Sequence, residues 1–122
     1  MYKNIILITI VALLTVSSQI FFKKGLKTNG ELRLNNFYDF GMNAIKLLQN
    51  KFIIIGIFIA VISAFLWLAI ISKLDLTIAF PVSSGIFFIL LFLTSWVFIG
   101  ESITLIKIIG VAIIILGIYL IF

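Results

Sequence analysis

Four long apolar stretches, separated by polar breaks, dominate the pattern of residues along the chain. They run from about Ile5 to Phe22, Phe52 to Ser72, Thr77 to Ile99 and Ile103 to Phe122. Each is close to the roughly 20 residues that an α-helix needs to cross about 30 Å of hydrocarbon. Polar residues do not alternate with apolar ones, as they would in a membrane barrel, and only a helix satisfies its own backbone groups without water. The pattern predicts an all-α membrane protein in which residues 1–122 form one domain, a bundle of four transmembrane helices.

The long break between the first two stretches, residues 23–51, divides into two parts. Lys23–Asn36 contains Gly25, Gly30 and three asparagines, which predicts a loop. In the second part apolar residues recur at helical spacing: Phe37, Phe40, Ala44, Leu47 and Leu48. Such a pattern is typical of an amphipathic helix lying in the membrane interface, and a helical lead-in to the second span is the other interpretation.

The other two breaks, Lys73–Leu76 and Gly100–Ser102, are tight turns. Connections this short make consecutive helices run antiparallel and side by side. The second, third and fourth helices are therefore predicted to be adjacent neighbours.

Composition excludes the soluble classes of protein. The chain is 64% hydrophobic and 11% charged, against roughly 45–50% and 25% in an average soluble domain. It cannot supply the polar surface that a small globule needs. A soluble enzyme, a disordered chain and a nucleic-acid-binding protein are thereby excluded, which leaves an integral membrane protein.

Side chains suited to catalysis are scarce. The chain has no cysteine and no histidine, so the commonest metal ligands and the commonest general base are missing. Its four carboxylates lie in the breaks and form no acid–base pair. Neither an enzymatic activity nor a metal site or cofactor is predicted.

Basic residues are distributed unevenly between the two ends of the predicted helices. One side receives seven of them: Lys23, Lys24, Lys27, Arg33, Lys46, Lys51 and Lys107. The other side receives Lys3 and Lys73. Because cytoplasmic loops carry an excess of Lys and Arg, the first break is predicted to be cytoplasmic and both termini outside. The same bias argues against an antiparallel homodimer and leaves a parallel homodimer, a monomer or a heteromer.

Polar residues inside the first stretch share one helix face. Thr15, Gln19 and Lys23 recur every fourth residue, and Ser18 lies beside them. An amide in the membrane costs free energy unless it bonds to protein or water, so this face is predicted to look inward. One interpretation is a polar substrate path with Lys23 at its cytoplasmic mouth. The other is hydrogen bonding between helices, with a lysine that extends to the interface.

Later polar and small residues give further candidates. Pro81 cannot donate to a carbonyl one turn earlier, and Ser83 and Ser84 follow it, so backbone groups there can be re-satisfied or offered to a ligand. Glu101, just before the fourth helix, is predicted to act locally on the helix dipole. Gly110 and Gly117 share a face that allows close helix approach, within one protomer or between two.

Taken in order, these residues resemble the four-helix branch of the drug/metabolite transporter superfamily. Ser18–Gly25 is similar to the family's Gln-x-x-x-Lys-x-Gly end of the first helix. Leu66–Pro81 resembles its Leu-Trp pair, turn and Ala-(Tyr/Phe)-Pro, and Gly100-Glu101 resembles its Gly-Glu turn. The resemblance continues through Gly110–Gly117 and covers nearly the whole chain except about residues 28–51.

Two subgroups of the superfamily are candidates for the resemblance. Small multidrug resistance proteins carry a membrane-embedded Glu that binds proton and cation alternately, and Thr15 stands where that Glu would be. No other carboxylate lies within a predicted span. The chain is instead more similar to EamA-like transporters and to the subunits that flip aminoarabinose-linked undecaprenyl phosphate, although Phe80 replaces the usual Tyr.

The resemblance implies a transporter that flips a polyprenyl-phosphate-linked sugar or a similar amphipathic lipid across the cytoplasmic (inner) membrane. The alternatives are a small-molecule or multidrug exporter and a non-transporting membrane subunit of a larger complex. Expected partners are membrane lipids, the substrate, and a second copy or a related small subunit in a dimer. The expected substrate-binding residues are Thr15, Ser18, Gln19, Lys23, Lys24, Trp67, Phe80, Pro81, Ser83 and Ser84.

Overall fold

The computed structural model describes residues 2–29, 32 and 34–121, and nearly all of these residues are helical. Its elements are α1 (Tyr2–Asn29), α2 (Phe37–Leu48), α3 (Lys51–Ile71), α4 (Leu76–Thr94), the π-helix η1 (Ser95–Ile99) and α5 (Leu105–Ile121). No strand occurs in the described part of the chain. The predicted all-helical class is confirmed.

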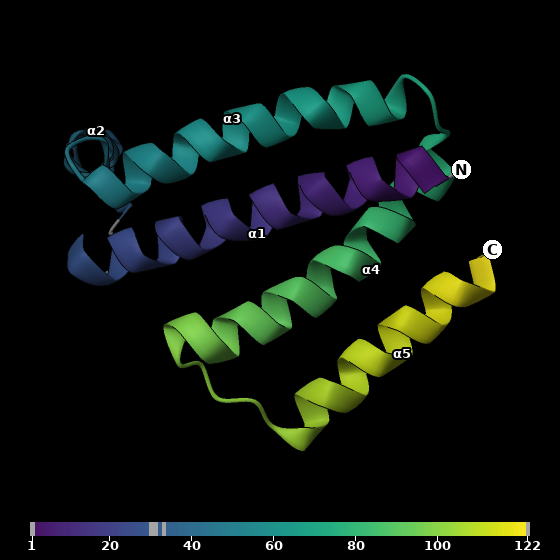
Figure 1. Ribbon diagram of the computed structural model, residues 1–122. Helices are drawn as coiled ribbons and strands as arrows, with labels where there is room; N and C mark the ends of the chain where they lie inside the picture. Colours follow the sequence, from purple (N-terminus) through teal and green to yellow (C-terminus); the bar gives the residue numbers. More distant parts are fainter. Residues whose placement is uncertain (1, 30–31, 33, 122) are drawn as a thin grey trace.

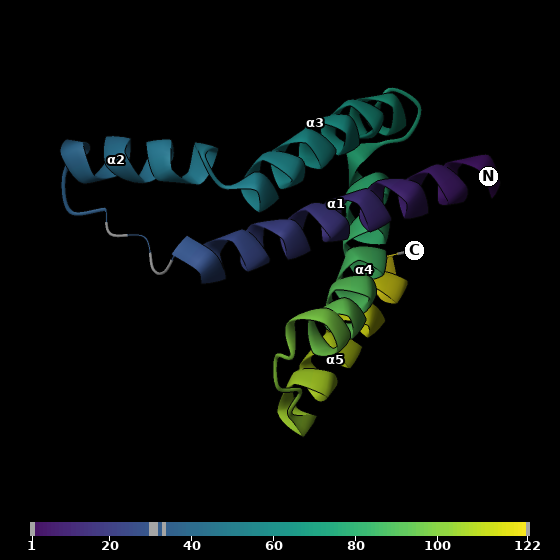
Figure 2. The same cartoon turned by 60° about the vertical axis from the view of Figure 1, so that its left-hand side comes forward.

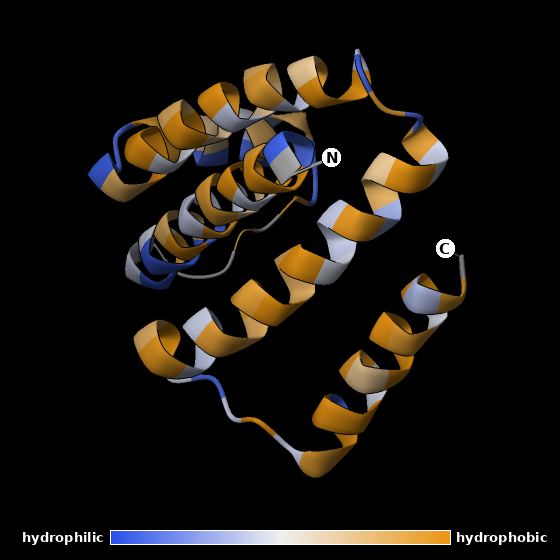
Figure 3. Cartoon of the chain, turned by 45° about the vertical axis from the view of Figure 1, so that its right-hand side comes forward, coloured by the Kyte–Doolittle hydropathy of each residue, from blue (hydrophilic) through white to orange (hydrophobic). Residues whose placement is uncertain are grey.

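Within the described residues, three helices are long and apolar enough to cross a membrane: Lys3–Thr28 in α1, Lys51–Ile71 in α3, and Leu76–Ile99 in α4 with η1. The fourth apolar helix, α5, is shorter. Hydrophobic residues cover the helices, and hydrophilic residues gather at the helix ends and connections (Figure 3). These are the helices of a membrane protein.

The prediction of a loop over Lys23–Asn36 is wrong in its first half, because α1 continues to Asn29. Gly25, which indicated a loop, instead allows α1 to approach α3. A Cβ atom added there would come within 2.7 Å of Cγ1 of Ile53. Asn50 fixes the same crossing, since its Nδ2 donates to the carbonyl of Gly25 at 3.0 Å. Gly30 and Arg33 lie outside the described residues.

The helix expected in the second half of the long break is confirmed as α2. Asn36 caps its first turn, where the side-chain oxygen accepts from the backbone N–H of Asp39 at 2.8 Å. The α2 axis lies across the direction of α1 and α3, because Figure 1 looks nearly along α2 while these two helices run across the picture. No α2 residue is buried, and its apolar residues Phe37, Phe40 and Leu48 are exposed.

The core lies where α1 packs against both α3 and α4 (Figure 1). Ile8 and Val11 of α1 join Ile70 of α3 and Ala79 of α4 in one buried cluster. Further along, Gly56 of α3 faces α1. A Cβ atom there would lie 2.8 Å from the ring of Phe22. Buried small residues therefore set how closely α1 and α3 can pack.

The predicted neighbour relations among the later helices are only partly met. After their connection, α3 and α4 diverge, as Figure 2 shows, and touch little because α1 lies beside both. Among the described elements α5 contacts only α4, and most of its residues are exposed. The predicted bundle of four helices is therefore not confirmed.

Candidate functional site

An open cavity of about 290 Å³ lies between α1, α3 and α4, and we call it the groove. Six of the residues proposed from sequence line it: Thr15, Ser18, Gln19, Trp67, Phe80 and Ser83. Sequence reasoning missed its other five lining residues: Val11, Phe22, Ala60, Ser63 and Ala64. The fold thus brings together residues that are distant along the chain.

Helical periodicity explains how each element contributes to the groove. On α1 the lining residues Val11, Thr15 and Gln19 are four apart and share one face. On α3 the small residues Ala60 and Ala64 continue the spacing of Gly56, one turn earlier, which is the small-residue pattern of closely packed membrane helices. That spacing was the signal in the sequence that could have identified the α3 wall.

Three of the four hydroxyl groups in the groove, those of Thr15, Ser18 and Ser63, hydrogen bond within the protein. Thr15 Oγ1 donates to the carbonyl of Val11 at 2.8 Å and lies 2.6 Å from Oγ of Ser63 on α3. Ser18 Oγ donates to the carbonyl of Thr15 at 2.7 Å. Ser63 and Ser18 are both buried. Thr15 and Ser63 therefore bind α1 to α3, which supports the interpretation of Thr15 as a contact between helices.

Gln19 differs from these hydroxyls. Its side chain is exposed on the groove wall, and no other described residue hydrogen bonds to it. An amide offers two donors and one acceptor oxygen. At this depth of a membrane helix those groups need a partner, because hydrocarbon supplies none. Gln19 thus has hydrogen-bonding capacity left for a ligand, and so does Ser83, whose hydroxyl hydrogen bonds to no other described residue.

Aromatic rings form the wall opposite α1. Trp67 of α3 and Phe80 of α4 meet edge to face, with ring centroids 6.3 Å apart. Edge-to-face contacts of this kind add about 0.5–1.5 kcal/mol beyond simple burial. The pair joins two helices that otherwise diverge, and gives the groove an apolar side.

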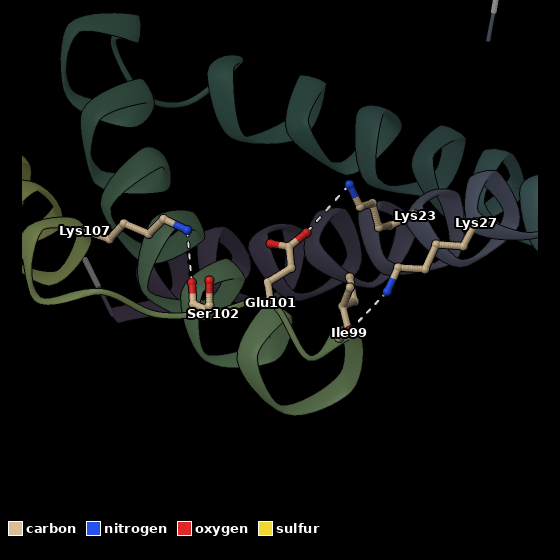
Figure 4. Close-up of polar contacts among 6 residues, drawn as sticks. All are labelled: Lys23, Lys27, Ile99, Glu101, Ser102 and Lys107. Carbon is tan, nitrogen blue, oxygen red and sulfur yellow. Dashed lines mark hydrogen bonds and ion pairs between the residues drawn. The ribbon is translucent and has the colours of Figure 1, made fainter. Parts of the chain in front are cut away.

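The mouth of the groove on the α2 side is tied to the α4–α5 connection. Lys23 Nζ lies 3.7 Å from Oε1 of Glu101, and Lys27 Nζ donates to the carbonyl of Ile99 at 3.1 Å (Figure 4). Lys23 and Lys27 continue the every-fourth-residue row of Thr15 and Gln19 along α1. A row of polar residues on α1 therefore runs from the groove to these contacts with Glu101 and Ile99.

Glu101 was expected to act locally at the start of the fourth helix, and the structure places it differently. Its carboxylate faces Lys23 of α1, and α5 begins only at Leu105. The capping contact at that start comes from Thr104, whose Oγ1 accepts from the backbone N–H of Lys107 at 3.3 Å. Gly100 makes the turn possible, since its φ of 75° is a left-handed conformation that glycine adopts without a steric penalty.

Five other predicted residues lie away from the groove lining. Lys24 is exposed on α1, while Pro81 and Ser84 are half-buried on α4. Gly110 and Gly117 are exposed, with nothing within 4 Å of a Cβ atom added at either. The face that they share therefore does not pack within this chain. On the α4–α5 side, a close contact occurs at Gly85 of α4, where an added Cβ would meet Ile118 at 3.2 Å.

The chain matches no protein-family model, no curated protein and no solved structure. Within its described residues, no group of three or more His, Cys, Asp or Glu is placed to hold a metal ion.

Proposed function

We propose that this chain is a membrane transporter of the drug/metabolite transporter type that translocates a polyprenyl-phosphate-linked sugar or a similar amphipathic lipid. The observation that carries the proposal is the groove, an open cavity with apolar walls and a free amide at Gln19. Such a lipid needs an apolar surface for its tail, hydrogen-bonding groups for its sugar and a cation for its phosphate. The process requires no covalent chemistry, and the chain therefore acts as a carrier.

The groove and the lysines just beyond it on α1 supply these three elements. Phe22 and the aromatic pair Trp67 and Phe80 provide the apolar surface. Gln19 provides the hydrogen bonds to sugar hydroxyls. Lys23 lies one turn beyond Gln19, and Lys24 follows it. A lysine ammonium near a membrane surface attracts an anionic group by about 1 kcal/mol.

A small-molecule exporter of the multidrug resistance type is the alternative, and the groove favours it less. A cationic drug calls for a carboxylate in the site, and no groove-lining residue carries one. Thr15, where that carboxylate would stand, is bonded to Ser63 instead. A non-transporting subunit would not need an exposed, unpartnered amide at Gln19.

The proposed placement follows from the basic end of the molecule. This end of the molecule contains the last turns of α1, all of α2, and the first turns of α3 and α5 (Figure 1). The opposite end contains the first turn of α1 and the last turn of α5. We place it at the cytoplasmic surface because basic residues gather there. The 28 residues of α1 exceed the roughly 20 needed to span, so its lysine-rich last turns project beyond the hydrocarbon. Lying across the spans, α2 then rests in the interface with its apolar residues against the lipid.

Cysteine labelling checks this orientation, since the chain has no cysteine of its own. A cysteine added after Phe122 is expected to react with an impermeant maleimide from outside intact cells. One replacing Asn29 is expected to react only after the membrane is opened. The reverse pattern would overturn the orientation.

We further propose that the face of α5 bearing Gly110 and Gly117 packs against a second protomer. Both positions are open in the single chain, and small residues on one helix face let two helices approach closely. Gly117→Leu is expected to shift the protein in detergent from dimer to monomer, whereas Gly41→Leu on α2 is not. A dimer fraction unchanged by Gly117→Leu would show that this face of α5 does not form the dimer interface.

Lys23 is expected to contribute charge at the groove mouth. Lys23→Gln should weaken binding of a phosphate-bearing lipid about fivefold, the effect of about 1 kcal/mol of attraction. Lys23→Arg should retain most of the binding because guanidinium is also a cationic donor. The control is Lys73→Gln, in the α3–α4 connection at the opposite end of the helices. Equal binding by all three variants would show that phosphate is not held at Lys23.

The transport proposal is tested in proteoliposomes that contain a polyprenyl phosphate linked to a fluorescently labelled sugar. Dithionite quenches the label in the outer leaflet only, so translocation appears as loss of the protected fraction. We expect quenching beyond half of the label with the protein and not in empty vesicles. If the protein takes up ethidium and does not translocate the lipid, the exporter is favoured instead. If it shows neither activity, the chain is a non-transporting subunit.

A further inference from the structure

A second cavity, of about 170 Å³, lies between α4, η1 and α5, separate from the groove. Its lining residues are Phe88, Leu91, Phe92, Ser95, Trp96, Glu101, Ser102, Ile103, Lys107 and Val111. None of them belongs to the groove lining, and the transport proposal makes no use of this cavity.

The polarity of this cavity changes from one end to the other. Phe88 and Phe92 line it along α4, Ser95 and Trp96 follow on η1, and Glu101 lies at the α4–α5 connection. At a rise of about 1.5 Å per residue, Phe88 and Ser95, seven positions apart, are separated by roughly 10 Å along the helix. The lining therefore runs from apolar in the span to charged at the membrane surface, as a phospholipid does.

The charged end holds one cation and one anion, each with capacity left. Lys107 Nζ donates to the carbonyl of Ser102 at 3.0 Å, and an ammonium group has three donors. Glu101 contacts Lys23 through Oε1 at 3.7 Å, and both side chains are about half-exposed. Figure 4 shows Lys107 and Glu101 on the two sides of Ser102. A headgroup could thus meet a donor and an acceptor together.

We propose that this cavity binds the headgroup of a zwitterionic phospholipid that carries a primary amine, as phosphatidylethanolamine does. Lys107 binds the phosphate, and the second carboxylate oxygen of Glu101 accepts from the ammonium. The lipid chain follows Phe92 and Phe88 into the bilayer. A phosphatidylcholine headgroup has the same charges but no N–H to donate, and a phosphatidylglycerol headgroup lacks the cation. The lipid is a bilayer component, so this inference stands apart from the transported substrate.

The two tryptophans of the chain allow this site to be observed alone. Trp96 lines this cavity, and Trp67 lines the groove. In the full chain with Trp67→Phe, Trp96 is the sole indole fluorophore. Brominated lipid chains quench tryptophan on contact, so quenching reports how much of a given lipid occupies the site.

The experiment uses vesicles of unlabelled phosphatidylcholine with a minor fraction of one brominated lipid. We expect brominated phosphatidylethanolamine to quench Trp96 with about two- to tenfold higher apparent affinity than brominated phosphatidylcholine or phosphatidylglycerol, the effect of one hydrogen bond. Glu101→Gln should remove the preference for phosphatidylethanolamine over phosphatidylcholine. Lys107→Gln should weaken the binding of phosphatidylethanolamine itself. Asp75→Asn and Lys73→Gln, in the opposite connection, are the matched controls and should change neither.

Four outcomes would overturn the proposal. Equal quenching by all three lipids would show that the cavity has no headgroup preference. A preference for phosphatidylglycerol would indicate an anionic lipid held by lysine alone. A phosphatidylethanolamine preference that survives both Glu101→Gln and Lys107→Gln would place the lipid-binding site outside this cavity. Soluble phosphoethanolamine that displaces the brominated lipid would show that the headgroup alone suffices and that the apolar end adds nothing.

Discussion

Gln19→Leu is expected to abolish transport of the lipid-linked sugar while leaving expression and folding intact. The Gln19 amide lines the groove and hydrogen bonds to no other described residue, so its loss removes contacts to a ligand rather than to the protein. Each hydrogen bond to a neutral sugar hydroxyl contributes about 0.5–1.5 kcal/mol, and the amide can make more than one. The loss of transport rate is therefore about tenfold or more, measured with the labelled lipid in proteoliposomes.

The chain offers a matched control for this change, since its other glutamine, Gln49, follows α2 outside the groove. Gln49→Leu makes the same chemical change and should leave transport as it is. A glutamine that only joined helices would show its loss as lower stability, by about 0.6–2 kcal/mol. Normal transport with lower stability in Gln19→Leu would thus assign Gln19 to packing.

Gly56→Leu is expected to lower the free energy of unfolding by about 3 kcal/mol or more, the upper end of the usual effect of overpacking. Even the first added atom would lie 2.8 Å from the Phe22 ring and 3.2 Å from the carbonyl oxygen of Ser18. The ring can move, but the backbone carbonyl of α1 cannot move without separating the two helices. Because α1 and α3 frame the groove, transport should fall with stability.

The control for this change is Gly41→Leu in α2, where a Cβ atom would meet nothing within 4 Å. It replaces a helical glycine in open space, which leaves stability unchanged or raises it by up to about 1 kcal/mol. Unfolding of both variants in detergent, followed by circular dichroism during titration with dodecyl sulfate, gives the comparison. Equal stability of the two variants would contradict the close approach of α1 and α3 at Gly56.

Much of the helical framework could be predicted from the sequence, because long apolar runs leave a membrane chain no alternative to helices. The first span and its polar row were predicted from local spacing alone. The row of Thr15, Gln19 and Lys23 needs only the helical repeat. Capping by Asn36 likewise makes α2 a local feature.

What could not be predicted depends on which helices touch. Gly25 is a residue type typical of loops, and its role in helix packing becomes visible only with Ile53 beside it. Ser63 was one serine in an apolar stretch until α1 brought Thr15 to 2.6 Å. Glu101 was assigned to its own helix because its partner, Lys23, is distant in the sequence. The hairpin rule for short turns places α3 beside α4, but does not anticipate α1 beside both.

The central claim is that the groove between α1, α3 and α4 is the path of an amphipathic, phosphate-linked lipid. The most direct test uses a polyprenyl-phosphate sugar with a photoreactive diazirine in the polyprenyl chain, and mass spectrometry of the labelled protein in proteoliposomes. Labelling of Ala64 and Trp67, which line the groove, should be suppressed by excess unlabelled lipid. Phe65, adjacent in sequence but exposed away from the groove lining, should show no suppression. Labelling that is equally insensitive to competitor at Ala64 and Phe65 would contradict the claim.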